Sequence, residues 1–243
     1  MKPEFEAWSR QYKGYLRSIA GKIDGEFAFI GGTALSLVYL QHRMSEDLDF
    51  IYLNRDSDPE FIVENIANSV DGDYELETNL KDNMGKQLGQ RWYLLDGAAK
   101  IKIDVIENRL IAEKNLEVGY YEEIPVLSLA NLYESKIKLL ASQSGGDEFG
   151  FHSSREQNVR DWLDVYELSQ SVERLSSFLL NSIDTSESLI LNIEEALSQI
   201  NGDRLRQEAR YLCYEREFTK TEFIQHFEEC LDTWYGFQFE NFP

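Results

Sequence analysis

Apolar residues recur at two different periods along this chain, and the change of period divides it into two parts. Short apolar or alternating runs predict strands at 27–30, 47–53, 74–80, 90–95 and 99–106. Helical spacing of apolar residues in the same half predicts helices at 4–22, 33–42 and 59–70. From Ser128 onwards helical spacing dominates, with predicted helices at 128–142, 155–170, 172–182, 187–200, 203–216 and 220–234. The pattern predicts an α+β protein with a mixed α/β domain, residues 1–127, and a C-terminal α-helical bundle, residues 128–243.

Composition indicates a folded protein and disfavours non-specific binding to nucleic acid and insertion into a membrane. The chain has 243 residues, of which 42% are hydrophobic and 13% aromatic, so its excess of acids does not indicate disorder. Its formal charge of −20 opposes non-specific binding to a phosphate backbone, which needs clustered Lys and Arg. The N-terminal segment lacks the apolar core of a signal peptide, and no apolar run approaches the roughly 20 residues of a membrane span. We expect a soluble, cytoplasmic protein without a membrane partner.

Two glycines separate a short apolar strand from an apolar helix. The run "FAFI" at 27–30 is followed by Gly31-Gly32, which tolerates the backbone angles of a tight turn. At the start of the following helix, backbone N–H groups and the Thr33 hydroxyl can face the phosphates of a nucleoside triphosphate. Gly-Gly before a helix is also common in proteins, so the pair alone is equally consistent with an ordinary turn.

Three aspartates are predicted on one face of two strands. Side chains alternate along a strand, so Asp47 and Asp49 share a face, with their Cα atoms about 6.6 Å apart, while Leu48 and Phe50 point into the core. In "IKIDVI" Asp104 is expected to face the same way from a neighbouring strand. A divalent cation such as Mg²⁺ relieves the repulsion between such carboxylates and supports two-metal nucleotidyl transfer. A D-x-D motif alone, however, more often lies on an exposed strand and binds no metal.

The order of these features resembles the polymerase β-like nucleotidyltransferase superfamily, in which a Gly-Gly turn, a helix, a D-x-D strand and a later strand aspartate follow one another. The string "GGTALSLVYLQHRMSEDLDF" at 31–50 resembles, more specifically, the AbiEii/AbiGii toxin family. Residues at that family's Arg-x-Ser-x-Asp-Leu-Asp-Phe positions are Arg43, Ser45, Asp47, Leu48, Asp49 and Phe50. The segments "YESKIKLLAS" and "VRDWLDVYEL" are similar to its lysine and aspartate helices, with Lys136, Arg160, Asp161 and Asp164 at matching positions. The resemblance extends over about residues 27–168.

The resemblance implies an enzyme that moves a nucleoside monophosphate from a nucleoside triphosphate to an acceptor hydroxyl and releases pyrophosphate. It implies Mg²⁺ as cofactor, with Mn²⁺ as an alternative, held by Asp47, Asp49 and Asp104. The nucleotide-binding residues that it implies are Gly31, Gly32, Thr33, Arg43, Ser45 and Lys136. The catalytic residues that it implies are Asp47, Asp49, Asp104, Lys136 and Asp161, with the last two reaching a cleft between the domains. By the same resemblance, the chain is the toxin of a bacterial toxin–antitoxin or phage-defence system, with tRNA as acceptor and a cognate antitoxin as partner.

Helical geometry distinguishes two lysines of the predicted helix 128–142. At about 100° per residue, Lys136 falls in the centre of an apolar stripe and Lys138 on the opposite side. The stripe consists of Leu129, Leu132, Tyr133, Lys136, Leu139 and Leu140. Two interpretations of Lys136 remain open: a charge that contacts nucleotide phosphate, or a buried ion pair with an acid such as Asp161 or Asp164.

The acceptor is the least defined part of the prediction. The link "QSGGDEFGFHSSRE" at 143–156 is longer and more acidic than the short basic link of the family. The most basic C-terminal stretch, 203–220, holds five bases against four acids, which is also typical of a solvated helix surface. Those bases are Arg204, Arg206, Arg210, Arg216 and Lys220. Two other functions remain open: transfer to a protein or small-molecule acceptor, which the acidic composition favours, and a non-catalytic nucleotide-binding scaffold, which the three aspartates disfavour.

Overall fold

A computed structural model of the chain divides into two compact units, Met1–Leu132 and Tyr133–Pro243. It describes residues 2–81, 87–110, 115–143, 159–181, 183 and 185–241. The glycine-rich link at 143–156 falls outside the described residues except for Gln143. Among the described helices, none is long and apolar enough to cross a membrane.

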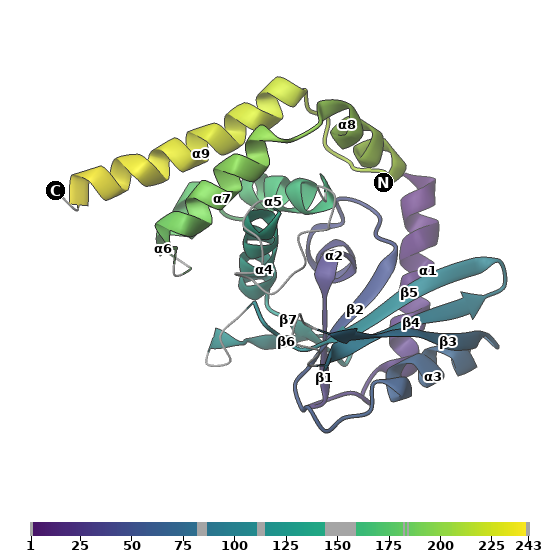
Figure 1. The fold of residues 1–243 in the computed structure, drawn as a ribbon. Coiled ribbons are helices and arrows are strands. Elements are labelled where there is room, and N and C mark those ends of the chain that lie inside the picture. The colour runs from purple at the N-terminus through teal and green to yellow at the C-terminus, as the bar shows by residue number, and fades with distance from the viewer. Residues whose placement is uncertain are drawn as a thin grey trace. The chain divides into compact units, whose positions relative to one another are not determined.

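The described part of the first unit is built on one mixed sheet (Figure 1). Its strands are β1 (Phe27–Ile30), β2 (Asp47–Tyr52), β3 (Asp73–Lys81), β4 (Gln87–Asp96), β5 (Ala99–Ile106), β6 (Val118–Tyr121) and β7 (Ile124–Leu127). They lie in the order β3-β4-β5-β2-β1-β7-β6. Strand β2 pairs antiparallel with β1 and parallel with β5, and β1 pairs parallel with β7. The two central strands β1 and β2 therefore follow each other in sequence, whereas β5 joins them from much later in the chain.

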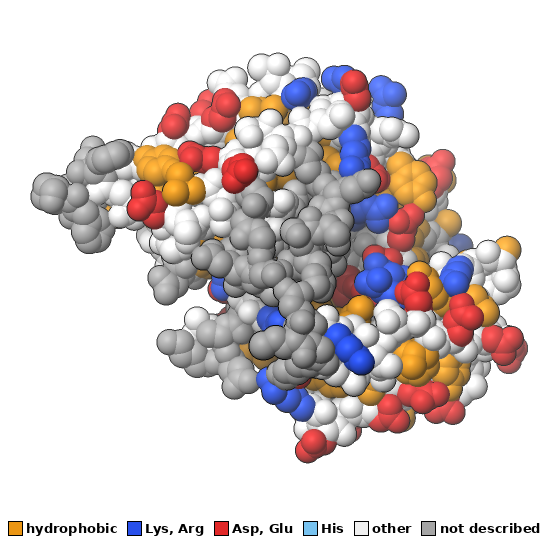
Figure 2. Space-filling view, viewed as in Figure 1, with side chains coloured by type: hydrophobic (Ala, Val, Ile, Leu, Met, Phe, Trp, Pro, Cys, Tyr) orange, Lys and Arg blue, Asp and Glu red, His pale blue; other side chains and the backbone are white. Residues whose placement is uncertain are grey.

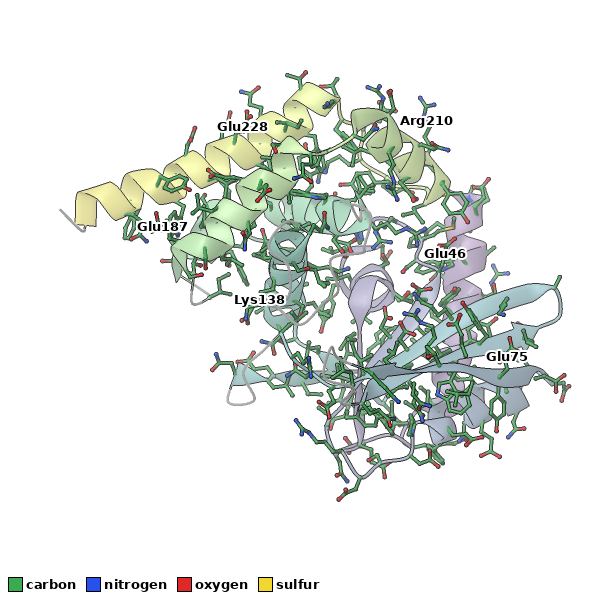
Figure 3. The ribbon with its side chains drawn as sticks, in the orientation of Figure 1. Glu46, Glu75, Lys138, Glu187, Arg210 and Glu228 are labelled. Carbon is green, nitrogen blue, oxygen red and sulfur yellow. The ribbon has the colours of Figure 1, made fainter. Side chains whose placement is uncertain are left out.

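Helix α1 (Pro3–Ile19) fixes the segment that leads into β2. It begins at a proline, which suits the first turn of a helix, and it buries Phe5, Tyr12, Leu16 and Ile19 at the predicted spacing. Trp8 Nε1 donates to the carbonyl of Ser45 at 2.6 Å. The hydroxyl of Tyr12 donates to the carbonyl of Glu46 at 2.8 Å, and Figure 3 shows Glu46 beside α1. The residues just before Asp47 are thus held by α1 rather than by the sheet.

The predicted helix after the glycines begins earlier and ends earlier than expected. It consists of α2 (Gly31–Ala34) and a π-helical continuation, η1 (Leu35–Leu40). The amide of Gln41 donates to the carbonyl of Ser36, and the left-handed φ of 53° at Gln41 ends the helix. The first turns are buried, as expected, but Val38 and its two successors are half-exposed. Helix α3 (Glu60–Ser69) follows β2 and packs against β3 and β4 and against α1.

The described residues of the second unit form helices and connecting segments, with no strand among them. The helices are α4 (Leu129–Ser142), which begins in the first unit, α5 (Val159–Ser171), α6 (Leu175–Asn181), α7 (Glu187–Ser198), α8 (Gly202–Tyr211) and α9 (Lys220–Asn241). Ser186 and Asn201 cap the N-termini of α7 and α8 with their side chains. Aromatic rings pack between α5 and α9, with the centroids of Trp162 and Phe227 4.8 Å apart. The helical character agrees with the sequence, and the bundle arrangement remains a prediction.

Candidate active site

Gly31 gives the carboxylate of Asp49 room to lie against the turn. The antiparallel pairing of β1 with β2 sets Ile30 opposite Asp49, so the next residue, Gly31, comes directly beside that side chain. A Cβ atom added to Gly31 would stand 2.2 Å from Asp49 Oδ2, well inside any contact distance. Gly31 also has φ +79°, a left-handed backbone that favours glycine. The turn therefore needs a glycine at this position for two independent reasons.

Gly32 leaves room for two other predicted nucleotide-binding side chains, those of Arg43 and Ser45. A Cβ atom on Gly32 would lie 2.6 Å from Nη2 of Arg43 and 3.2 Å from Oγ of Ser45. The Thr33 hydroxyl donates to the carbonyl of Asp47, and Thr33 is fully buried. We expected this hydroxyl to face a triphosphate, and the structure instead gives it a positioning role between the turn and β2. Arg43 is also buried, and its Nη1 donates to the carbonyl of Met44 at 2.7 Å.

The three predicted metal-ligating aspartates lie on adjacent strands in register. In the parallel pair of β2 and β5, Asp49 is directly opposite Asp104, and Asp47 is opposite Lys102. Leu48 and the next core-facing residue of β2 are fully buried, which confirms that the aspartates share the other face. The burial pattern departs from strict alternation at the end of β2: Ile51, which alternation places with the aspartates, is 3% exposed, and Tyr52, which alternation places in the core, is half-exposed.

Two basic residues neutralise the carboxylate face, and they were not predicted as site residues. The Nζ atom of Lys102 lies 2.7 Å from Asp47 Oδ2 and 3.8 Å from Asp104 Oδ2. Arg91 of β4 binds Asp104 through two parallel hydrogen bonds, of 2.7 Å to Oδ1 and 2.9 Å to Oδ2. The sequence signal for Lys102 was its period-two spacing from Asp104. Arg91 carried no signal, because its position depends on the register of β4 against β5.

The pKa values of both bases reflect this environment. Burial alone would lower the pKa of Lys102, but the charges of Asp47, Asp104 and Asp49 outweigh it and raise that pKa above its ordinary value. The hydrogen bonds with Asp104 are the main reason that the pKa of Arg91 is also raised. Both side chains are therefore cations at neutral pH.

The aspartate face fits a hard divalent cation in its chemistry. Three carboxylates supply the oxygen donors that Mg²⁺ prefers, and the Lys102 ammonium marks the place where positive charge is stabilised between Asp47 and Asp104. As the side chains stand, no group of three or more His, Cys, Asp or Glu among the described residues is arranged to hold a metal ion. A metal would therefore have to share or replace the present cationic partners of these oxygens.

Lys136 forms a buried ion-pair network within the second unit. Its Nζ lies 2.6 Å from Asp161 Oδ1 and 2.8 Å from Asp164 Oδ2, and all three side chains are at most 8% exposed. This is one of the two interpretations that the sequence left open. The predicted contrast between the two lysines agrees with the structure, because Lys138 is less buried than Lys136 and pairs with Glu134 at 2.6 Å. The predicted stripe is only partly correct, because Leu129 and Leu139 are half-exposed and Ile137 is fully buried. Contact of Lys136 with nucleotide phosphate remains a prediction.

The basic stretch at 203–220 is partly engaged by neighbouring acids. Arg206 pairs with Asp203 at 2.5 Å, and Arg216 binds Glu167 through two bonds of 3.0 Å. On the described part of the face in Figure 2, Lys and Arg side chains lie among Asp and Glu side chains and form no continuous basic surface. The stretch is therefore a weak candidate for RNA binding.

A shallow cavity on α1 has a more basic lining. Its volume is about 310 Å³. The residues around it are Phe5, Glu6, Ser9, Arg10, Lys13, Arg17 and Gln41. Arg10, Lys13 and Arg17 are three and four residues apart, so they follow one face of the helix. This basic row was not among the predicted site residues, although its helical spacing is visible in the sequence.

A protein-family model matches most of the chain. Residues 15–232 match the family model described as "Nucleotidyl transferase AbiEii toxin, Type IV TA system". No curated protein matches the sequence.

Two solved structures from Helicobacter pylori have a similar fold. JHP933 superposes with a TM-score of 0.62 and 13% identity over 99% of this chain and 96% of that protein. A second protein, assigned as a nucleotidyltransferase, superposes with a TM-score of 0.59 and 13% identity over 100% of both chains. The family match covers most of the sequence and includes the turn and the three aspartates, and the chain therefore belongs to the AbiEii toxin family of nucleotidyl transferases.

Proposed function

We propose that this nucleotidyltransferase is Mg²⁺-dependent and transfers a nucleoside monophosphate from a nucleoside triphosphate to a hydroxyl of an RNA, with tRNA as the acceptor. The proposal places the chain as the toxin of a toxin–antitoxin or phage-defence system. The observation that carries it is the convergence of Gly31, Asp49 and Asp104, in which one carboxylate lies against the turn and faces another across paired strands.

In this proposal each part of the first unit has a separate task. Asp47, Asp49 and Asp104 hold Mg²⁺, which supplies charge neutralisation at the reacting phosphate when bound. The N–H groups at the start of α2 face the phosphates, and Thr33 holds that turn against β2. Asp104, which Arg91 holds in place through two hydrogen bonds, would also help to deprotonate the acceptor hydroxyl.

The first test is nucleotide transfer by an Asp49→Asn variant. Purified protein is incubated with each α-labelled nucleoside triphosphate, MgCl₂ and total tRNA, and label on RNA is measured. We expect Asp49→Asn to reduce transfer by about 100-fold or more, because it removes a negative charge from the centre of the site. The matched control is Asp73→Asn, an exposed carboxylate at the start of β3, which should transfer like the wild type. Full transfer by Asp49→Asn would contradict the proposed mechanism.

A second candidate is transfer to a protein or small-molecule acceptor. The net charge of −20 and the internal pairing of Arg206 and Arg216 favour it over RNA. The same labelling in a nuclease-treated lysate separates the two, because label would then appear on protein or on a small molecule. Absence of transfer to every acceptor, with nucleotide binding retained, would instead indicate the non-catalytic scaffold.

A further inference from the structure

The carboxylate face of β2 and β5 carries its own cation. Lys102 and Asp104 are two residues apart on one strand, and Asp47 is directly opposite Lys102 on the parallel neighbour. The ammonium therefore lies between two of the aspartates, at 2.7 Å from Asp47 and 3.8 Å from Asp104. A divalent cation held by Asp47 and Asp104 would compete with this ammonium for the same carboxylates.

The ion pairs of Lys102 with Asp47 and Asp104 are partly buried, unlike an ion pair on the open surface. The side chains of Lys102 and Asp47 are 26% and 29% exposed, and that of Asp104 is 10% exposed, so solvent screens them only in part. Arg91 holds Asp104 by both oxygens from the other side, which fixes that carboxylate while Lys102 bridges to Asp47. Without Lys102, Asp47 would lose the cation that lies 2.7 Å from its Oδ2.

Lys100 provides an internal comparison on the same strand and face. Its Nζ lies 2.9 Å from Glu75 of β3 and 3.8 Å from the centroid of the Tyr93 ring, and its side chain is 51% exposed. Figure 3 labels Glu75 at this outer part of the sheet. Lys100 and Lys102 therefore carry the same charge on the same face of β5, but only Lys102 contacts the aspartates of the site.

We infer that Lys102 is a resident counter-cation of the active site, which stabilises the carboxylate face without metal and competes with the divalent cation for Asp47 and Asp104. The inference rests on the proposed metal-dependent function and adds a residue that sets metal affinity. Arg91 acts as the positioning residue that keeps Asp104 in register when the ammonium moves away.

The test measures Mn²⁺ binding and thermal stability of the full chain, with no substrate present. Free Mn²⁺ is followed by electron paramagnetic resonance during titration of wild type, Lys102→Met and Lys100→Met. We expect Lys102→Met to bind Mn²⁺ about tenfold more tightly, because a competing positive charge has been removed. Its Tm without metal should be several degrees below that of the wild type, and saturating Mn²⁺ should remove most of this deficit. Lys100→Met should match the wild type in Mn²⁺ affinity.

Two further variants keep the result interpretable. Lys102→Arg retains the charge and should bind Mn²⁺ like the wild type, and Lys102→Gln replaces Lys102→Met if the latter does not fold. If the wild type binds Mn²⁺, Asp49→Asn does not, and neither neutral Lys102 variant gains affinity, the inference is wrong while the metal-dependent function stands. If no variant binds Mn²⁺, the metal dependence itself is wrong and the inference falls with it.

Discussion

At the scale of single residues, the site depends on the absence of a side chain at Gly31 and Gly32. Gly31 combines a left-handed φ with a carboxylate where its Cβ would be, and Gly32 leaves the corresponding space to Arg43. A side chain at either position would displace a charged group of the site rather than an apolar one. Small volume at the turn is therefore a requirement of the chemistry as well as of the backbone.

Gly31→Ala should separate this requirement from the general effect of replacing glycine. We expect a loss of unfolding free energy of about 1–3 kcal/mol and a large loss of nucleotide transfer, because the new Cβ would clash with Asp49 Oδ2. The control is Gly14→Ala within α1, where a Cβ would meet no atom within 4 Å. That change should raise the free energy of unfolding by about 0.5–1 kcal/mol and leave nucleotide transfer unchanged. Urea unfolding and the RNA-labelling assay check both variants, and equal behaviour of the two would refute the close approach.

At the scale of elements, buried charges of α5 attach it to two neighbours. Asp161 and Asp164 bind Lys136 of α4, and Glu167, one turn further on, binds Arg216 beyond α8. The helix therefore carries acids on faces that would otherwise be apolar. Each acid is stabilised by a specific basic partner, and each partner sets a geometric constraint that apolar packing alone would not impose.

Lys136→Met should destabilise the protein by about 3–5 kcal/mol, because it leaves two buried aspartates without their common cation. Adding Asp161→Asn and Asp164→Asn should restore most of that stability. If Lys136 also neutralises phosphate, the triple variant will be folded but about 100-fold less active, measured by denaturant unfolding and RNA labelling. Lys138→Met is the control and should change transfer little. A fully active triple variant would limit Lys136 to a structural role.

Glu167 should make the free energy of unfolding depend on pH below about pH 4.5. Burial raises its pKa, but hydrogen bonds from Arg216, Ser171 and Tyr214 outweigh burial and lower the pKa to about 2, from 4.5. The stabilisation is therefore complete above about pH 4.5 and is lost as pH falls towards 2. Glu167→Gln should cost on the order of 2 kcal/mol at pH 7 and much less near pH 2, by denaturant unfolding at several pH values. Glu215→Gln, an exposed change next to Arg216 in sequence, should alter the free energy of unfolding little at every pH.

The local parts of this architecture were predictable and the long-range parts were not. Asp47 and Asp49 follow from strand alternation, and Lys136 follows from helical phasing, because both depend only on near neighbours in sequence. Arg91 was missed because cross-strand register is set by the whole sheet. Strands β6 and β7 were missed because Gly119 weakens the strand signal of the one and Pro125 that of the other.

At the scale of the whole molecule, net charge determines where a phosphate-bearing acceptor can be tolerated. A chain of charge −20 repels RNA over most of its surface, so binding must depend on a local excess of bases. The row Arg10, Lys13 and Arg17 on α1 borders a cavity, and α1 is tied to Ser45 just before the aspartate strand. This row lies in the same unit as the aspartate strand, and we therefore predict that it meets the acceptor.

Replacing Arg10 and Lys13 with Ala should weaken tRNA binding and flatten its salt dependence by roughly two counterions. Binding of the nucleoside triphosphate should not change. The matched pair is Arg206→Ala with Arg210→Ala, of which Arg206 is already paired with Asp203, and it should leave the slope nearly unchanged. Filter binding at several salt concentrations measures both slopes. A flatter slope in the α8 pair, with none in the α1 pair, would reverse the assignment.

The parallel pairing of β2 with β5 has a consequence for the order in which the protein folds. Strands β1 and β2 and the turn between them lie within residues 27–52, so their contacts close early and at small entropic cost. Lys102 and Asp104 arrive only after the excursion through α3, β3 and β4, as a contact of high sequence separation. A nascent or partly unfolded chain thus exposes Asp47 and Asp49 without the lysine that balances them. We expect hydrogen exchange to show β5 becoming protected later than β1 and β2 during refolding, and the active site to be among the last features completed.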